Sequence, residues 1–246
     1  MMRLGVIGGT AMTSLATDEI EFTRSDNIVA QTKYGNVPLL CVQSGENELI
    51  FLERHHGNGV TPPHKINHLA NIDAMAGANV DAILAVCSVG TIPSDFPPGS
   101  VGYATQYIDL TGKESTFFDS NAKFTSMTNP FDLDMNTKLE SVLSKIQPGL
   151  KLSRTYWLAH GPHFETTAEI NAIEKLGGEV VGMTMPRECK LAAELGIPYA
   201  AILVSSNWAA GREPGDSNKD LDHEEVSTTA ESKLGPVIEC IKVFTQ

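Results

Sequence analysis

A chain of 246 residues can bury the core of one domain, and we expect a single domain over residues 1–246. The formal net charge of −12, with no basic cluster, argues against a nucleic-acid-binding protein, because phosphate backbones are held mainly by Lys and Arg. No run approaches the roughly 20 apolar residues of a membrane-spanning helix, and the start lacks the apolar run of a signal peptide, so we expect no membrane contact and a cytoplasmic location.

Short apolar runs that alternate with helical patterns predict an α/β fold. Several of these runs lack polar alternation, as in strands that are covered on both faces. The expected strands are residues 4–7, 38–42, 49–52, 82–86, 101–107, 156–159, 180–183 and 199–205.

Helical patterns lie between these strands. Thr166 and Glu169 form a capping box that opens one helix, and this role explains Glu169 without any part in catalysis. Pro186 opens another helix, which we expect to end at Gly196. Further helices are expected at residues 66–70 and from about His223 to the end of the chain, with loops at residues 111–135 and 207–222.

Gly8, Gly9 and Thr10 directly follow the first strand. Glycines let a backbone approach an anion and the Thr hydroxyl adds a donor, so this segment is either an anion site or a simple tight turn. The stretch does not fit GxGxxG, and no acidic residue closes a second strand about 20 positions further on. An NAD-dependent oxidoreductase of the Rossmann type is therefore disfavoured.

Arg54 and His55 end a short apolar strand, where a guanidinium can fork onto two phosphate oxygens. The alternative is an ordinary surface arginine. His56, His64 and His68 crowd nearby, but their spacing fits no familiar set of metal ligands, so we expect no metal site.

Cys87 and Ser88 begin a small-residue turn at the end of the apolar strand at residues 82–86. Ligands of open α/β sheets bind at this carboxyl edge, where backbone N–H groups are exposed. A nucleophilic Cys87 is the rival interpretation, but nothing in the sequence puts a base beside it, which favours inert packing. The cysteines are widely scattered and indicate no zinc cluster.

Residues near several predicted strand ends fit a flat heterocycle and a sugar. Phe164 can stack on an aromatic base, and Glu165 can accept a hydrogen bond from a ring N–H. Met183 suits a ribose face, and Thr184 is an N-cap position whose neighbouring N–H groups can hold an anion. Asn207 can donate to a purine nitrogen. A core Met and a turn-forming Asn are the plain alternatives.

Together these motifs give the chain a resemblance to the trimeric purine nucleoside phosphorylase family, especially its 5′-methylthio-nucleoside branch. The resemblance runs nearly end to end in the order and spacing of its motifs. The matching segments are residues 8–10, 54–55, 161–169 and 181–184, Asn207, and residues 223–226. It implies a mixed, twisted central sheet partly closed into a barrel, a homotrimer, phosphate as co-substrate, and neither a metal nor an organic cofactor.

The resemblance also implies roles for individual residues. Phosphate would be held by Thr10, Arg54, His55, Cys87, Ser88 and Thr184. The nucleoside would contact Phe164, Glu165, Met183, Asn207, Trp208, Ala209 and His223, together with Phe124 of a neighbouring subunit. Asn207 would act catalytically by stabilising the negative charge that develops on the purine while phosphate attacks C1′.

Substrate choice within the family implies a 6-oxopurine, because members that act on adenine place Asp where this chain has Asn207. Glu165 would accept the N1–H that hypoxanthine carries and neutral adenine lacks. His223 stands where ordinary purine nucleoside phosphorylases direct a histidine toward the 5′-hydroxyl. Thr91 and the order of residues 185–188 depart from the family pattern.

The expected function is phosphate-dependent cleavage of a purine nucleoside of the S-methyl-5′-thioinosine or 5′-methylthioadenosine type. Because of His223, a general purine nucleoside phosphorylase acting on inosine or guanosine is the alternative. The rival from another class is a non-catalytic nucleoside-binding protein on the same fold, which the loss of Arg54 or Asn207 would have favoured.

Overall fold

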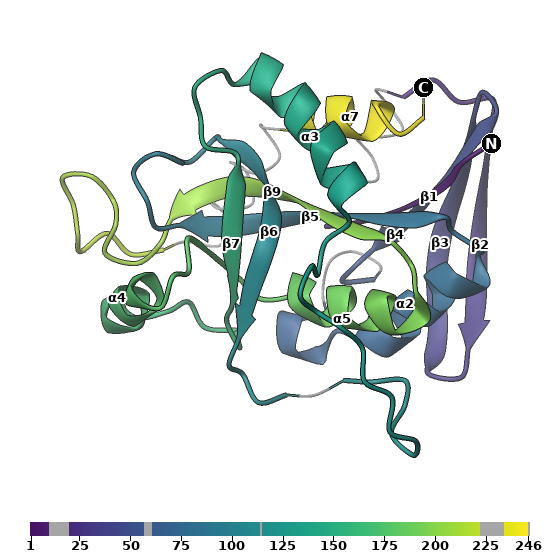
Figure 1. Ribbon diagram of the computed structural model, residues 1–246, viewed down its shortest axis with the longest axis horizontal. Coiled ribbons are helices and arrows are strands. Elements are labelled where there is room, and N and C mark those ends of the chain that lie inside the picture. Colours follow the sequence, from purple (N-terminus) through teal and green to yellow (C-terminus); the bar gives the residue numbers. More distant parts are fainter. Residues whose placement is uncertain (10–19, 57–60, 114, 222–233, 246) are drawn as a thin grey trace.

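A twisted, mixed sheet runs through the middle of the molecule (Figure 1). The computed structural model describes all residues except 10–19, 57–60, 114, 222–233 and 246. In that part of the chain the sheet has nine strands in the order β2-β3-β4-β1-β5-β8-β7-β6-β9. The strands are β1 (Arg3–Gly8), β2 (Arg24–Thr32), β3 (Gly35–Ser44), β4 (Asn47–Glu53), β5 (Ala82–Thr91), β6 (Val101–Asp109), β7 (Ser153–Leu158), β8 (Val180–Gly182) and β9 (Tyr199–Trp208).

Strand β5 joins an open half of the sheet to a closed half. Its first residues pair with β1 in parallel, and Gly90 and Thr91 near its end pair with β8. The other edge of β5 pairs with β9, which pairs in turn with β6. The path β5–β8–β7–β6–β9 therefore returns to β5 and closes into a barrel. This confirms the α/β fold with a partly barrel-like sheet that the resemblance implies.

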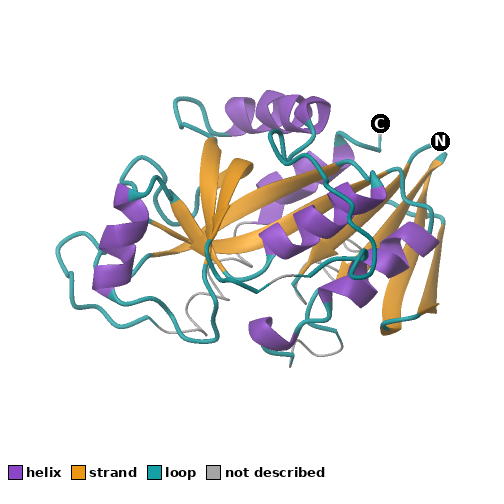
Figure 2. Ribbon diagram, turned by 60° about the horizontal axis from the view of Figure 1, so that its bottom comes forward, coloured by secondary structure: helices purple, strands orange, loops and turns teal. Residues whose placement is uncertain are grey.

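Helices cover both faces of the sheet (Figures 1 and 2). A first core contains residues of α2 and α5, a second contains residues of α3 and α7, and a smaller third contains residues of α4. Along β5, Ile83 and Ala85 belong to the first core, while Ala82 and Leu84 belong to the second, which explains why this strand is apolar on both faces. Within the described ranges, no helix combines the length and apolar character needed to cross a bilayer. The helices are η2 (Pro63–Lys65), α2 (His68–Gly77), α3 (Leu133–Ile146), α4 (Thr167–Lys175), α5 (Met185–Leu195) and α7 (Leu234–Lys242).

Two helix boundaries have the local chemistry that the sequence predicts. The Thr166 hydroxyl accepts from the Glu169 N–H at 3.2 Å, and the Thr166 N–H donates to the Glu169 carboxylate at 2.7 Å, so the capping box opens α4. Helix α5 ends at Gly196, whose φ of 72° lies in the left-handed region, where glycine carries no steric penalty. Both predictions are confirmed.

Strand β2 and helix α3 were not predicted from the sequence. Strand β2 is an edge strand that is mostly exposed, so it lacks the apolar run by which a strand is recognised. Helix α3 begins at Leu133, inside the segment expected to be a loop. Asp132 is its N-cap, and the Asp132 side chain accepts a hydrogen bond from the Met135 N–H at 2.9 Å. The helix expected from about His223 starts outside the described residues, and its later part is α7.

Gly102 allows close packing within the barrel, and we expect a larger residue there to destabilise the protein. A Cβ at this position would collide with the Leu152 carbonyl oxygen and approach the Phe96 ring to 3.0 Å. Gly102→Ala should therefore lower the free energy of unfolding by roughly 1 to 3 kcal/mol, as overpacking does in other cores. Gly77→Ala is the matched control, because a Cβ there meets nothing within 4 Å. Urea unfolding of both variants measures the difference, and equal stabilities would contradict the packing argument.

Candidate active site

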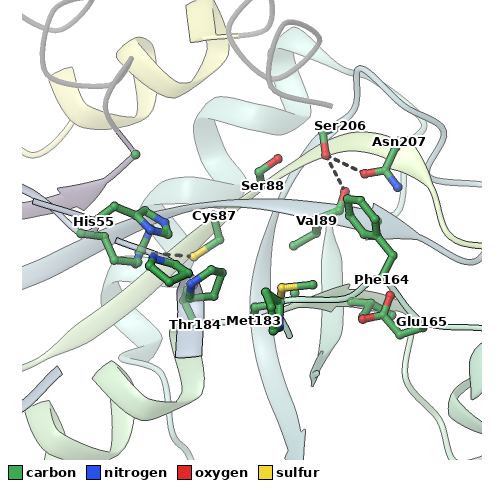
Figure 3. Close-up of a pocket in the computed structure, with 18 of the residues that line it drawn as sticks. His55, Cys87, Ser88, Val89, Phe164, Glu165, Met183, Thr184, Ser206 and Asn207 are labelled. Atoms are coloured by element: carbon green, nitrogen blue, oxygen red, sulfur yellow. Dashed lines mark hydrogen bonds between the residues drawn. The ribbon is translucent and has the colours of Figure 1, made fainter. Parts of the chain in front are cut away.

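A cavity of about 460 Å³ opens where the carboxyl ends of several strands meet the start of α5 (Figure 3). Open α/β sheets bind their ligands at this edge. The predicted site residues that line it are Arg54, His55, Cys87, Ser88, Phe164, Glu165, Met183, Thr184, Asn207 and Ala209. Segments far apart in the sequence therefore supply a single cavity.

The labelled side chains gather at two ends of this cavity, with Met183 between them (Figure 3). One end contains a histidine, a thiol and a hydroxyl, and the other contains an aromatic ring, a carboxylate and an amide. The first end is formed by His55, Cys87 and Thr184, and the second by Phe164, Glu165 and Asn207.

Arg54 is buried, and its guanidinium is held on several sides. Nε and Nη2 donate to the two carboxylate oxygens of Glu188 at 2.5 and 3.1 Å, and Nη1 donates to the Val86 carbonyl at 3.1 Å. Nη2 also faces the Cys87 sulfur at 3.7 Å. An arginine carries five N–H donors, so one hydrogen on Nη1 has no partner among the described residues. Arg54 can therefore offer a ligand one direct hydrogen bond as well as its charge.

Glu188 is fully buried beneath the cavity and keeps its charge. Burial alone would raise the pKa of this carboxyl, but the Arg54 charge outweighs it and holds the pKa well below its usual range. The Tyr199 hydroxyl donates to the same carboxylate at 3.0 Å. His68 lies with Nδ1 3.6 Å from Glu188, and burial lowers its pKa, so a neutral histidine stands beside the charged pair.

The turn after β4 is fixed by hydrogen bonds from the following loop and from α2. His55 Nδ1 lies 2.6 Å from the Thr61 carbonyl oxygen. His56, with φ of 51°, has Nε2 2.6 Å from Oδ1 of the fully buried Asn71. Asn71 Nδ2 donates to the Arg54 carbonyl at 3.3 Å. Asn71 thus ties α2 to the backbone that presents both Arg54 and His55.

The turn predicted at Cys87 and Ser88 is wrong, because both residues lie inside β5, which continues to Thr91. Strand β9 continues alongside it as far as Trp208, so pairing persists where small residues had indicated a turn. The Cys87 thiol is buried, and burial raises its pKa to about 12, so it stays protonated at neutral pH. Ser88 is exposed toward the cavity.

Thr184 occupies the N-cap of α5, as the sequence predicts. Its hydroxyl makes no capping hydrogen bond to the helix, and its N–H donates to the Tyr156 hydroxyl at 3.3 Å. The hydroxyl is therefore free of the usual capping task. The positive end of the helix also lies at the cavity, which favours an anion there.

Glu165 follows Phe164 just before α4 and has a carboxylate oxygen in need of a partner. Oε1 is buried and accepts no hydrogen bond from any described residue. Burial raises the pKa of Glu165, although its backbone N–H acts in the opposite direction. Leaving such an oxygen unsatisfied is costly, so an N–H from a ligand would stabilise this end of the cavity.

A β-bulge in β9 positions Asn207. Val89 pairs with Ser205 but Gly90 pairs with Asn207, so Ser206 is the extra residue. The Ser206 hydroxyl lies 2.9 Å from Asn207 Oδ1, and Asn207 Nδ2 donates to the Trp208 carbonyl at 2.8 Å. Because that carbonyl can only accept, the orientation of the amide is fixed. The second Nδ2 hydrogen remains for a ligand.

Met183 lies in the middle of the cavity because Gly161 leaves room for it. A Cβ on Gly161 would sit 2.6 Å from the Met183 sulfur, and the φ of 64° at this residue also favours glycine. The Met183 thioether thus packs directly over the Gly161 backbone, between the two ends of the cavity.

Four predicted site residues do not contribute a side chain to this cavity as described. Trp208 does not line it, and only its carbonyl contacts Asn207. Phe124 is 96% exposed on the surface of the molecule. Thr10 and His223 lie outside the described residues.

Glu188 is the principal site residue that sequence reasoning missed. It is separated from Arg54 by 134 positions, so no local spacing reveals the pair. Ser206 and Asn71 were missed as well, although the buried β9 run and the α2 pattern contain them. Among the described residues, no three His, Cys, Asp or Glu side chains gather into a group that could hold a metal ion.

The arrangement of sheet, barrel and cavity is that of a known family. The sequence profile of the Phosphorylase superfamily matches residues 4–241, and the chain belongs to this family. The fold resembles that of methylthioadenosine phosphorylase from Schistosoma mansoni in complex with adenine, with a TM-score of 0.86 over 99% of this chain and 90% of that one, at 21% identity.

Two relatives share about a third of the sequence. The 6-oxopurine nucleoside phosphorylase of Pyrococcus furiosus is 33% identical over 98% of this chain and 91% of its own length. A probable S-methyl-5′-thioinosine phosphorylase of Methanopyrus kandleri is 35% identical over 86% of this chain and 80% of its own length.

The buried pair of Arg54 and Glu188 predicts a large loss of stability when one partner is neutralised. Glu188→Gln should lower the free energy of unfolding by about 3 to 5 kcal/mol, because it leaves the Arg54 charge buried and uncompensated. Glu174→Gln is the matched control: it breaks a pair with Arg212 in which Glu174 is 58% exposed, and should cost about 1 kcal/mol or less. Urea unfolding at neutral pH measures both, and a similar loss in the two variants would contradict the role assigned to the pair.

Proposed function

We propose that the chain catalyses phosphate-dependent cleavage of the N-glycosidic bond of 6-oxopurine nucleosides, which gives the free purine and a ribose 1-phosphate. Phosphate is a co-substrate in this proposal, and no metal or organic cofactor takes part. Support comes first from the relatives, whose names specify a 6-oxopurine nucleoside and S-methyl-5′-thioinosine.

The two-ended cavity is the observation that carries the proposal. One end offers cationic, hydroxyl and helix-terminal groups suited to an anion, and the other offers an aromatic ring, a carboxylate and an amide suited to a purine. Met183 between them suits a ribose face. A sugar bridging the two ends would hold its C1′ between the base and the phosphate.

The chemistry at C1′ follows from this placement. Phosphate attacks from the face opposite the base, the C1′–N9 bond breaks, and its electron pair moves onto the purine. Asn207 would donate its free Nδ2 hydrogen to N7 as negative charge accumulates there. Removing one preorganised donor of this kind typically costs about 100- to 1,000-fold in rate. The phosphate charge offsets the positive character of the sugar carbon, and no covalent enzyme intermediate is required.

Base selection is proposed to rest on Glu165 together with Asn207. The unpartnered Oε1 of Glu165 needs an N–H donor, and N1 of hypoxanthine or guanine supplies one. Neutral adenine has a lone pair at N1, which would face the carboxylate unfavourably. A 6-oxopurine is therefore preferred.

The substituent at C5′ has two candidates, methylthio and hydroxyl. The names of the relatives cover both, since one is named for 6-oxopurine nucleosides in general and the other for the methylthio compound. His223, the residue expected to meet this substituent, lies outside the described residues. We propose the methylthio-nucleoside as the substrate, with inosine or guanosine as the alternative.

A homotrimer is part of the proposal. Phe124 exposes 96% of its surface, so its ring is available to a neighbouring subunit. In the proposed trimer it reaches the cavity of a neighbouring subunit, where it would complete the wall around the sugar.

One panel of substrates tests the reaction class and the substrate together. Adenosine, inosine and their methylthio forms are each incubated with and without phosphate, and release of the free base is measured. We expect release only with phosphate, and faster release from the two hypoxanthine nucleosides. Release without phosphate would indicate a hydrolase, and no release in any arm would favour a binding protein.

Asn207→Asp should reverse the base preference. The variant loses the donor to N7 and adds a charge that repels the electron-rich 6-oxopurine, so kcat/KM for hypoxanthine nucleosides should fall about 100- to 1,000-fold. The adenine nucleosides should lose much less, because the 6-amino group can donate to the carboxylate. Asn121→Asp, the same change on an exposed residue, is the control. A parallel loss on both bases would rule out the selective role of Asn207.

A further inference from the structure

The hydrogen bond at His55 fixes which ring nitrogen carries a proton. Nδ1 lies 2.6 Å from the Thr61 carbonyl oxygen, and a carbonyl oxygen can only accept. Nδ1 must therefore be the protonated nitrogen. Thr61 lines the same cavity as His55, so this contact is part of the wall at the anion end.

The other ring nitrogen, Nε2, makes no hydrogen bond with any described residue. In a neutral imidazole with a protonated Nδ1, Nε2 has a lone pair and acts as an acceptor. The pKa of His55 is lowered, chiefly because the ring is buried and also because Arg54 is close, although the contact with Thr61 and the charge of Glu188 act in the opposite direction. A neutral ring at neutral pH follows.

An acceptor that carries no hydrogen is an unexpected group to find at an anion site. Among the described groups at this end, Arg54 and the start of α5 present N–H groups, and the hydroxyls of Ser88 and Thr184 can donate as well as accept. Inorganic phosphate near neutral pH carries two negative charges and still keeps one hydrogen. That hydrogen needs an acceptor, and the N–H groups of Arg54 and of the start of α5 cannot provide one. Nε2 of His55 supplies what these groups lack.

We infer that His55 accepts the hydrogen bond of the phosphate hydroxyl, so that the site selects a hydrogen-bearing anion and turns the charged phosphate oxygens toward Arg54, Thr184 and the sugar. This inference rests on the proposed function only in that phosphate is taken to bind at this end of the cavity. It makes His55 a specificity-determining residue, and His55 neither gains nor loses a proton.

Sulfate provides the comparison ligand, because it has the shape and charge of hydrogen phosphate but no hydrogen. Against sulfate, the lone pair of Nε2 would face an oxygen lone pair. Hydrogen bonds that involve a charged group stabilise by amounts that correspond to about 10- to 100-fold in affinity. Calorimetric titration of the protein at pH 7.5 should therefore give a Kd for phosphate about 10- to 100-fold below that for sulfate, and arsenate, which keeps a hydrogen, should behave like phosphate.

His55→Phe keeps an aromatic ring but removes the acceptor. The ratio of the two Kd values should fall toward one in this variant, mainly through weaker phosphate binding. His160→Phe is the matched control, because His160 is exposed and lines a neighbouring cavity but not this one, and it should keep the selectivity of the unchanged protein. Equal affinity for phosphate and sulfate in the unchanged protein would overturn the inference.

Nitrogen-15 NMR of the unchanged protein tests whether Nε2 of His55 is an acceptor, and it does not depend on the folding of a variant. With labelled histidine, the His55 signals should show a protonated Nδ1 and an unprotonated Nε2, both before and after phosphate is added. An Nε2 that becomes protonated on binding would make His55 a cationic donor and would overturn the inference.

The outcomes separate this inference from the proposed function. A preference for phosphate over sulfate without cleavage of any nucleoside would contradict the proposed reaction and support the role of His55. Cleavage that requires phosphate, combined with equal binding of phosphate and sulfate, would contradict the role of His55 and leave the reaction standing.

Discussion

The buried ion pair between Arg54 and Glu188 is the constraint on which the site depends. Two charges removed from water are tolerable only when they compensate each other, so the end of β4 and the first turns of α5 must stay in register. The pair also changes what Arg54 can do. Glu188 balances the charge of Arg54 and most of the Arg54 donors are occupied, so an anion must be held jointly by Arg54 with its remaining Nη1 hydrogen, the Thr184 hydroxyl and the positive end of the helix.

Around this pair, the residues that hold the site in place are not the residues that face the ligand. Strand β5 is shared by the open sheet and the barrel and is packed on both faces, so the residues at its end cannot move independently of either half. The groups that face the cavity come from strand ends and from the starts of helices. Asn71 and Tyr199, which touch no expected ligand position, keep those groups in place through the turn after β4 and through Glu188.

The fold could be predicted where apolar runs or capping signals are local. The strand at Leu4, the capping box at Thr166 and the stop at Gly196 depend on neighbouring residues alone. Strand β2 could not be predicted, because an exposed edge needs no apolar run, whereas α3 did carry a signal in the spacing of Met135, Leu139 and Leu143 after Asp132. Most of the cavity lining followed from the resemblance. The partner of Arg54 did not, since Glu188 meets it only through the tertiary fold.

The bulge at Ser206 shows that the pairing register of β9, and not only the residue types, determines which side chain lies in the cavity. Asn207 stands opposite Gly90, where a Cβ would come within 3.2 Å of its amide nitrogen. If β9 kept Ser206 and paired without the bulge, Ser206 would stand opposite Gly90 and Asn207 would stand opposite Thr91. The extra residue thus decides, together with the residue types, which side chain β9 presents beside Gly90.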